Sequence, residues 1–353
     1  MRLLIADKLD MRPLEALTLL GVEIVSQPQL GPADLPAALD GVNILVVRST
    51  KVTAEAIDAA GELGLIIRAG AGVNTIDVIA ASRRGVFVTN CPGKNAAAVA
   101  ELTMAHILAL DRRLVDATVG LRQGRWEKGE FQGAPGLLDK RIGVAGVGSI
   151  GRLVVDRAKA FGMEVHVWSR SMSAKRAAAL GAVPHKSLLE LARVSDVLTL
   201  HLPLNEQTRK IVDREVLEAL PAGAIFVNIS RAGVVDEEAL IEVTKAKGLR
   251  VGLDVFSDEP KTAGGEFRPA IMDAGTVYGT PHIGASTQQA QYAIASEVAR
   301  MVRAFMTEED VPNVVNVCRN TPARYALILR GLDEVGVLAN VFGVLKRHGI
   351  NVE

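Results

Sequence analysis

Short aliphatic runs alternate with helical stretches along residues 1–90 of the chain. In the helical stretches apolar residues recur every three or four positions, whereas each aliphatic run has the length of a buried strand. Strands that alternate with crossover helices predict a parallel sheet with both faces covered by helices. The expected strands are 3–6, 23–26, 44–48, 65–68 and 86–89, and the expected helices are 12–20, 33–39, 54–60 and 77–84.

A second alternation of the same kind occupies the middle of the chain. Before it, residues 95–114 are apolar on nearly every side, which predicts a helix buried between two domains or two subunits. A glycine-rich loop with Trp126 and Phe131 is expected to follow that helix. The amphipathic stretch 286–306 predicts a long helix that returns the chain to the first domain. The expected strands of this second run are 142–145, 165–168, 197–200, 224–227, 251–253 and 276–278.

The pattern predicts the α/β class, with two doubly wound parallel-sheet domains and a short tail. The tail is expected to hold a strand at 325–329 and a helix at 334–347 that is capped by Gly349. It is too short to bury a core alone. The expected segments are a discontinuous first domain (1–98 with 286–312), a second domain (99–285), a linker (313–322) and the tail (323–353).

Composition fits this class and argues against several kinds of partner. Hydrophobic residues make up 49% and aromatic residues 4% of the 353 residues, as expected for aliphatic buried strands. Lys+Arg and Asp+Glu both number 40, so neither a nucleic-acid nor a membrane-surface partner is expected. No apolar run has the length of a membrane span, and the amino-terminal run is too short for a signal peptide. Cys91 and Cys318 predict neither disulfides nor a metal site, which is typical of a cytoplasmic protein.

The sequence K-R-I-G-V-A-G-V-G-S-I-G-R at 140–152 joins a predicted strand to a predicted helix through three glycines. Gly146 permits a tight turn, Gly148 lets the backbone approach a pyrophosphate, and Gly151 lets helix and strand pack closely. The N–H groups at the helix start, where Ser149 and Ile150 lie, offer an anion site. This arrangement predicts dinucleotide binding.

Three predicted strands are each followed by a charged residue in a glycine- or proline-rich segment, namely Arg231, Glu259 and His282. Such strand ends meet at one edge of a doubly wound sheet. A guanidinium can hold a substrate carboxylate bidentately, and a histidine can exchange the hydroxyl proton near neutral pH. A carboxylate on the other ring nitrogen can stabilise the imidazolium. The set predicts hydride transfer at a 2-hydroxy acid.

The segments G-V-G-S-I-G, N-I-S-R-A-G-V-V-D-E, L-D-V-F-S-D-E-P and T-P-H-I-G-A-S-T resemble those of the D-isomer-specific 2-hydroxy acid dehydrogenases, over nearly the whole chain. V-R-S-T-K-V-T (47–53), R-A-G-A-G-V-N (68–74) and W-E-K-G-E-F-Q-G (126–133) are similar to segments of the D-3-phosphoglycerate dehydrogenases of that family. The resemblance implies a flavodoxin-like substrate domain and a Rossmann cofactor domain. It also implies that 323–353 is a partial ACT-like regulatory tail, for which the usual effector in the family is serine.

The resemblance also assigns residues to roles. It makes Arg231, Glu259 and His282 the catalytic residues. It places Ile229, Ser230, Asp254 and Gly284 near the nicotinamide and adds Leu202 and Ala285 to the cofactor site. The residues that it assigns to the substrate are the backbone of Ala71, Gly72 and Val73 and, for a phosphate end, Arg48, Ser49, Lys51 and Arg68.

The cofactor site departs from an NAD-specific pattern. A carboxylate is expected at the end of the second strand, about 20 residues after the last glycine, where it would accept hydrogen bonds from the ribose. Ser169 and Arg170 stand there instead, with Lys175 and Arg176 nearby. A small hydroxyl followed by a guanidinium leaves room and charge for a 2′-phosphate. These residues favour NADP(H), whereas the family resemblance favours NAD(H).

The expected reaction is oxidation of D-3-phosphoglycerate to 3-phosphohydroxypyruvate, the entry to L-serine biosynthesis. One alternative is an NADPH-dependent glyoxylate/hydroxypyruvate reductase. Another is a non-catalytic protein that senses nucleotides and keeps the fold for binding alone. The active site is expected between the two domains, and a homodimer is expected through residues 95–114.

Overall fold

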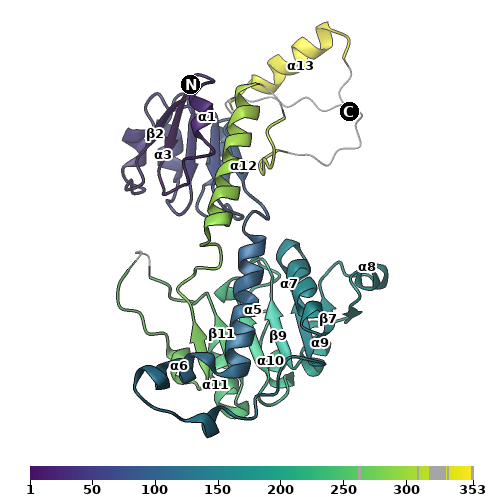
Figure 1. Ribbon diagram of the computed structural model, residues 1–353. Helices are drawn as coiled ribbons and strands as arrows, with labels where there is room; N and C mark the ends of the chain where they lie inside the picture. The colour runs from purple at the N-terminus through teal and green to yellow at the C-terminus, as the bar shows by residue number, and fades with distance from the viewer. Residues whose placement is uncertain (261–263, 308–309, 318–330, 332–333, 351–353) are drawn as a thin grey trace. The chain divides into compact units, whose positions relative to one another are not determined.

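The computed structural model describes residues 1–260, 264–307, 310–317, 331 and 334–350. The chain divides into two compact units (Figure 1). Unit 1 comprises Met1–Asn95 and Gln288–Glu353, and unit 2 comprises Ala96–Thr287. The expected α/β class with two parallel sheets is confirmed, because every strand pairing in both sheets is parallel.

Unit 1 contains a five-stranded sheet in the order β2-β1-β3-β4-β5. Alternate residues of its central strands point to opposite faces, so Leu3 and Ile5 belong to one hydrophobic core and Leu4 to the other. Helices α1 and α12 cover the first face, while α2, α3 and α4 cover the second. The bounds are β1 Arg2–Ile5, α1 Glu15–Thr18, β2 Glu23–Ser26, α2 Leu35–Ala38, β3 Ile44–Val47, α3 Ala54–Ala59, β4 Leu65–Arg68, α4 Val78–Arg83, β5 Phe87–Asn90 and α12 Gln288–Met306.

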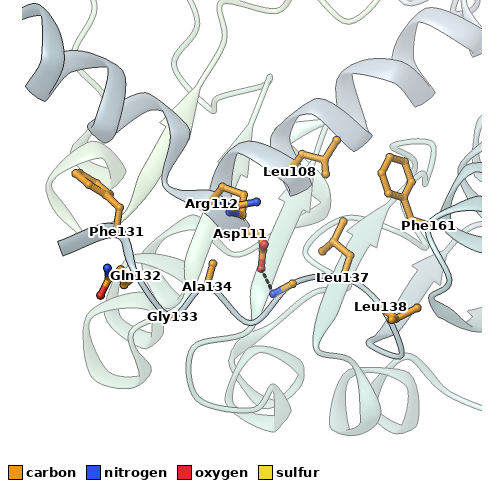
Figure 2. Close-up of a pocket in the computed structure, with 11 residues that line it drawn as sticks. Leu108, Asp111, Arg112, Phe131, Gln132, Gly133, Ala134, Leu137, Leu138 and Phe161 are labelled. Atoms are coloured by element: carbon orange, nitrogen blue, oxygen red, sulfur yellow. Dashed lines mark hydrogen bonds between the residues drawn. The ribbon is translucent and has the colours of Figure 1, made fainter. Parts of the chain in front are cut away.

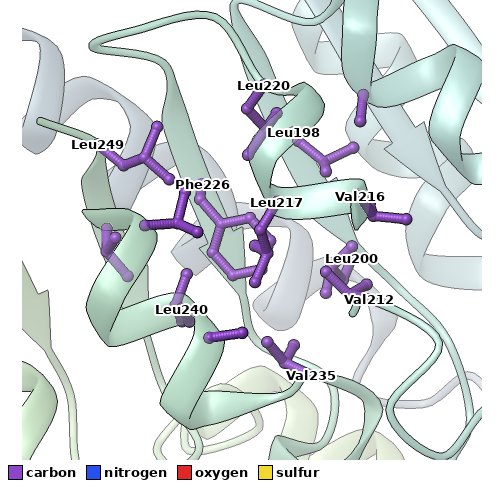
Figure 3. Close-up of a cluster of buried hydrophobic side chains, with 14 of the residues drawn as sticks. Leu198, Leu200, Val212, Val216, Leu217, Leu220, Phe226, Val235, Leu240 and Leu249 are labelled. Atoms are coloured by element: carbon purple, nitrogen blue, oxygen red, sulfur yellow. The ribbon is translucent and has the colours of Figure 1, made fainter. Parts of the chain in front are cut away.

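Unit 2 contains a seven-stranded sheet in the order β12-β11-β10-β9-β6-β7-β8. Helices α5, α7 and α8 bury their apolar sides on one face, and α9, α10 and α11 bury theirs on the other, around Phe226 (Figure 3). The strands are β6 Arg141–Ala145, β7 Glu164–Trp168, β8 Val183–Pro184, β9 Val197–Leu200, β10 Ile225–Asn228, β11 Arg250–Leu253 and β12 Val277–Gly279. The helices are α5 Ala96–Arg112, α6 Leu114–Arg122, η1 Lys128–Phe131, α7 Ser149–Ala160, α8 Ala174–Ala179, α9 Leu188–Val194, α10 Arg214–Ala219, η2 Ala232–Val234, α11 Glu237–Lys247 and η3 Ala270–Asp273.

Both sheets have a point at which the strand order reverses. In unit 2 the order reverses between β6 and β9, and in unit 1 between β1 and β3. The loops at the carboxyl ends of such neighbouring strands diverge to opposite faces, which leaves a crevice where ligands bind in doubly wound sheets. The glycine-rich turn follows β6, and Arg48 follows β3, so both predicted binding segments lie at these reversals.

The structure differs from the expected helix at 95–114 in two ways. Helix α5 ends at Arg112, Arg113 adopts a left-handed conformation (φ 48°), and a further helix, α6, begins at Leu114 where a loop was expected. Contacts within unit 2 explain why α5 is apolar on nearly every side, because it packs against α7 and against strands β10 and β11. The expectation that this helix is buried between domains or subunits is therefore not needed to explain its composition.

Smaller differences concern short elements and the tail. Helices α1 and α2 have four residues each, shorter than the expected 12–20 and 33–39, and strand β8 was not expected. The expected strand at 325–329 lies outside the described residues. The expected tail helix is α13, Val337–Arg347, and its assignment to an ACT-like module stays a prediction.

Candidate functional site

Three loops of unit 2 carry the predicted catalytic residues at one edge of its sheet. They follow the carboxyl ends of β10, β11 and β12, which are adjacent and parallel. Arg231 lies three residues beyond β10, and His282 lies three residues beyond β12. Glu259 lies in the loop that leaves β11.

The structure brings His282 and Glu259 into direct contact. Nδ1 of His282 lies 2.8 Å from Oε2 of Glu259. The other oxygen, Oε1, accepts a hydrogen bond from the backbone N–H of Phe256 at 2.9 Å, so the turn that carries the carboxylate also orients it. A carboxylate on Nδ1 favours the tautomer with the proton on that nitrogen, which leaves Nε2 available for a ligand. The His282 side chain is 51% exposed, so a ligand can reach it.

The loop that presents His282 is tightly turned. His282 has a left-handed backbone (φ 52°), and its N–H donates to the carbonyl of Thr280 at 2.9 Å. For a residue with a side chain this conformation costs about 1–2 kcal/mol, so the surrounding structure has to impose it.

The buried carboxylate of Asp254, directly after β11, holds this loop. Oδ1 accepts from the N–H of Ile283 at 2.8 Å and from the hydroxyl of Thr280 at 2.6 Å. Oδ2 accepts from the N–H of Gly284 at 2.8 Å. A Cβ atom at Gly284 would lie 2.9 Å from that oxygen, so the close approach requires glycine. Asp254 was predicted to lie near the nicotinamide, and the described hydrogen bonds of its carboxylate all join it to the His282 loop.

The loop after β10 is fixed by the side chain of Asn228. Its amide donates to the carbonyl of Arg231 at 3.0 Å, and its oxygen accepts from the N–H and the hydroxyl of Ser230 at 3.0 and 2.8 Å. The Arg231 guanidinium donates to the Ser230 carbonyl at 2.6 Å. Among the described residues it forms no ion pair, so its charge is available to an anionic ligand.

The glycine-rich turn has the space that a dinucleotide needs. Gly146 has a φ of 92°, and a Cβ atom there would lie 2.4 Å from the carbonyl oxygen of His201. A Cβ atom at Gly151 would lie 2.0 Å from the Gly146 carbonyl, whereas a Cβ atom at Gly148 would meet nothing within 4 Å. Gly148 is the N-cap of α7, so open space lies before a helix start that begins with Ser149 and Ile150. These residues fit a bound pyrophosphate.

The end of β7 lies beside the glycine-rich turn, because β7 is the neighbour of β6. Ser169 and Arg170 follow β7 directly, and the Arg170 guanidinium contacts the side-chain oxygen of Gln207. Arg176 donates to the carbonyl and the hydroxyl of Ser171 at 2.9 and 3.0 Å, which keeps a second guanidinium near this strand end. Positive charge therefore gathers where an NAD-specific site has a carboxylate.

The residues predicted to bind the substrate at its phosphate end lie in unit 1. Asp7 follows β1, and its carboxylate accepts from the N–H groups of Arg48, Ser49 and Thr50 at 2.7–3.1 Å and from the Ser49 hydroxyl at 2.7 Å. Burial raises the pKa of Asp7, but these hydrogen bonds outweigh it and hold the pKa below its ordinary value. Asp7 therefore shapes the loop that carries Arg48, Ser49 and Lys51.

Arg68, Ala71, Gly72 and Val73 lie at and after the carboxyl end of β4, next to β3 in the sheet. The Arg68 guanidinium folds over Gly70, where a Cβ atom would lie 1.7 Å from a guanidinium nitrogen. The Ala71 carbonyl accepts from the Asn90 side chain at 2.6 Å, which anchors the segment. The two predicted substrate segments thus follow neighbouring strands of unit 1.

A pocket of about 530 Å³ lies elsewhere in unit 2, between the end of α5, the segment after η1 and the end of α7 (Figure 2). Asp111 in this pocket accepts from the N–H of Gly136 at 3.2 Å. It also lines a neighbouring cavity beside Lys140, Asp196 and Arg250, which lie at the amino ends of strands. None of the predicted site residues lines either cavity, so the predicted chemistry is not placed there.

Asn228 and Thr280 were not predicted to have roles, although both stand inside quoted segments. The signal that could have found them is a polar residue at the last position of a buried strand or just beyond it.

None of the helices in the described part of the chain combines the length and the apolar character of a membrane span. The described residues also contain no cluster of His, Cys, Asp or Glu that could hold a metal ion.

Comparisons with known proteins show which family the chain is similar to. The family profile described as "D-isomer specific 2-hydroxyacid dehydrogenase, NAD binding domain" matches residues 104–284. The chain is 38% identical over 318 residues to the D-3-phosphoglycerate dehydrogenase of Methanocaldococcus jannaschii, covering 90% of this chain and 59% of that protein. The chain thus spans less than two thirds of the length of that relative.

A hydroxypyruvate reductase of Thermotoga maritima is 42% identical over 280 residues, covering 79% of this chain and 89% of that protein. The structure is also similar to that of an NADPH-dependent glyoxylate/hydroxypyruvate reductase from Sinorhizobium meliloti in complex with NADP and malonate. That match has a TM-score of 0.76 and 29% identity and covers 93% of this chain and 99% of the other. The chain belongs to the D-isomer specific 2-hydroxyacid dehydrogenase family.

Proposed function

We propose that the protein transfers hydride between a nicotinamide dinucleotide and a D-2-hydroxy acid. The observation that carries this proposal is the 2.8 Å contact between His282 and Glu259, on the sheet edge that also carries Arg231. The pair supplies an acid–base group and its support, and the arginine supplies a positive charge for a carboxylate.

The proton passes through Nε2 of His282 in this proposal, because Nδ1 faces Glu259. In the reductive direction His282 donates to the carbonyl oxygen of the 2-oxo acid, and in the oxidative direction it accepts the hydroxyl proton. Glu259 stabilises the imidazolium form and fixes the ring orientation. Arg231 binds the substrate carboxylate through two parallel hydrogen bonds and holds the carbonyl carbon in place.

A bound dinucleotide would supply or accept the hydride at its nicotinamide ring. Gly146, Gly148 and Gly151 and the start of α7 would hold its pyrophosphate. We propose that Leu202, Ile229, Ser230, Gly284 and Ala285 line the rest of its site, as the family resemblance implies. Leu202 supports this assignment, because it lies against Gly146 just after β9, at the reversal of the strand order.

D-3-phosphoglycerate is the proposed substrate, with 3-phosphohydroxypyruvate as product. The similarity to the M. jannaschii enzyme supports this choice, as do the basic residues Arg48, Lys51 and Arg68 in unit 1. We propose that these side chains and Ser49 bind the phosphate end, and that the backbone of Ala71, Gly72 and Val73 contacts the carboxylate.

Reduction of glyoxylate or hydroxypyruvate is the second candidate function. The T. maritima reductase is 42% identical to this chain and the M. jannaschii enzyme 38%, which favours the reductase. Ser169 and Arg170 also suit NADPH. A non-catalytic nucleotide sensor is disfavoured, because a sensor has no need of an oriented His282–Glu259 pair.

The test of the proposed function is turnover of 3-phosphohydroxypyruvate, hydroxypyruvate and glyoxylate by the full chain, with NADH and with NADPH. We expect the phosphorylated substrate to have the highest kcat/KM. His282→Ala should lower kcat by about 10²–10⁴-fold, because the general acid is lost, and should leave the dinucleotide Kd within about twofold. His348→Ala, in the tail, is the matched control and should turn over normally. Full turnover by His282→Ala would refute the proton-transfer role, and faster turnover of glyoxylate would favour the second function.

We also propose that NADPH is accepted and preferred over NADH, because Ser169 and Arg170 replace the ribose-binding carboxylate. Arg170→Ala should raise the KM for NADPH about tenfold, since a charge-assisted hydrogen bond to the 2′-phosphate is lost, and should change the KM for NADH by less than about twofold. Arg193→Ala removes an exposed arginine from α9 of the same unit and serves as control. A strong NADH preference of the unmodified protein would contradict this proposal.

A homodimer in the cytoplasm is the proposed assembly. Helix α6 exposes Leu114, Val115, Val119 and Leu121, each at 43–58%, and we place the subunit interface there rather than on the internally packed α5. Leu121→Glu should convert a dimer to a monomer in light scattering, whereas Leu338→Glu on α13 should not. A wild-type monomer would overturn the proposal.

We also propose that the protein is cytoplasmic. Its sequence has only two cysteines, which is typical of proteins from a reducing compartment. Cell fractionation tests this location.

A further inference from the structure

Helix α5 carries a buried histidine directly behind the loop that presents His282. His106 is 5% exposed, and its Nε2 lies 3.2 Å from the hydroxyl oxygen of Thr280. No motif in the sequence includes this histidine, and the proposed mechanism does not use it. A buried polar side chain aimed at a loop of the proposed active site therefore needs an explanation.

The sheet makes room for this histidine at one position. A Cβ atom at Gly252 would lie 3.1 Å from Cβ and from Nδ1 of His106, so the imidazole packs against the bare backbone of β11. Gly252 has no left-handed backbone that would demand glycine for another reason. The glycine and the histidine thus pack closely between α5 and β11, the strand that directly precedes Asp254.

The hydrogen bonds around Thr280 define the direction of each proton. Thr280 donates its only hydroxyl hydrogen to Oδ1 of Asp254, at 2.6 Å. Its oxygen can therefore only accept from His106, which requires the proton of the neutral ring to be on Nε2. Burial lowers the pKa of His106 and so keeps the ring neutral, although the charge of Asp254 acts in the opposite direction.

His106 donates to Thr280 and Thr280 donates to Asp254, whose carboxylate also accepts from the backbone N–H groups of Ile283 and Gly284. These two residues follow His282 directly. The His106 donor fixes the rotamer of Thr280, which in turn aligns the carboxylate that holds the turn. Shared hydrogen bonds of this kind reinforce one another in a buried site.

We propose that His106 is a positioning residue for His282, acting through Thr280 and Asp254. The inference rests on the proposed function, since it gives His282 its role in proton transfer. It adds a residue of α5 to the reaction without giving it contact with the substrate or the dinucleotide.

The test compares His106→Leu, which removes the donor, with His106→Gln, whose amide can still reach Thr280, and His106→Asn, whose shorter amide cannot. We expect kcat to fall about tenfold in the Leu and Asn variants. The KM values for the 2-oxo acid and for the dinucleotide should stay within about twofold of those of the unmodified protein. The Gln variant should recover to within about threefold of the unmodified protein. Ile107→Val, a conservative change at the adjacent buried position of α5, is the matched control and should leave kcat unchanged.

A second readout needs no turnover. Amide hydrogen exchange at Ile283 and Gly284 should be at least about fivefold faster in the Leu and Asn variants, and close to normal in the Gln variant. If the unmodified protein turns over none of the 2-oxo acids, the proposed function fails, and the exchange rates still decide whether His106 holds the loop. Unchanged exchange and unchanged kcat in His106→Leu would overturn the inference. Equal losses in all three variants would also overturn it, because they would indicate a packing role alone.

Discussion

The carboxylate of Asp254 makes the contact on which the candidate site depends. It lies buried at the end of β11 and accepts from the N–H groups of Ile283 and Gly284 and from the hydroxyl of Thr280. These bonds offset the cost of the left-handed backbone at His282 and so present its imidazole to Glu259.

The parallel sheet explains why residues distant in the sequence meet. Strands β10, β11 and β12 are neighbours, so their carboxyl ends place Arg231, Asp254 and the His282 loop at one edge. Three glycines let other groups approach closely: Gly252 admits His106, Gly284 admits Asp254, and Gly146 admits the His201 carbonyl. The same architecture in unit 1 brings the loop of Arg48 onto Asp7. In both units a carboxylate that directly follows a strand or lies two residues beyond it shapes a loop at the point where chemistry is proposed.

Most strands could be predicted to within one or two residues, because a buried parallel strand is a short aliphatic run with clear ends. Helix α6 could not, since the left-handed turn at Arg113 that separates it from α5 has no glycine to mark it. Helices α1 and α2 were expected to be longer, because apolar spacing does not distinguish one helical turn from several.

At the candidate site, the sequence predicted which loops meet but not how they are held. The spacing of Glu259 and His282 along the chain carries no sign of a 2.8 Å contact, which depends on the register of β11 and β12. His106 resembled any histidine in an apolar helix, because only the fold shows that Thr280 lies beside it. The predicted roles of the cofactor and substrate residues stay predictions.

The most direct test of the account is the kcat of Asp254→Asn, measured with the best 2-oxo acid and compared with that of Asp258→Asn. The amide side chain keeps the shape of Asp254 but cannot accept all three hydrogen bonds. Each charged bond is worth about 1.5–3 kcal/mol, so kcat is predicted to fall about ten- to hundredfold. Asp258 is exposed and accepts no hydrogen bond from another described residue, so Asp258→Asn should behave like the unmodified protein. Full turnover by Asp254→Asn would contradict the claim that this carboxylate holds the catalytic loop.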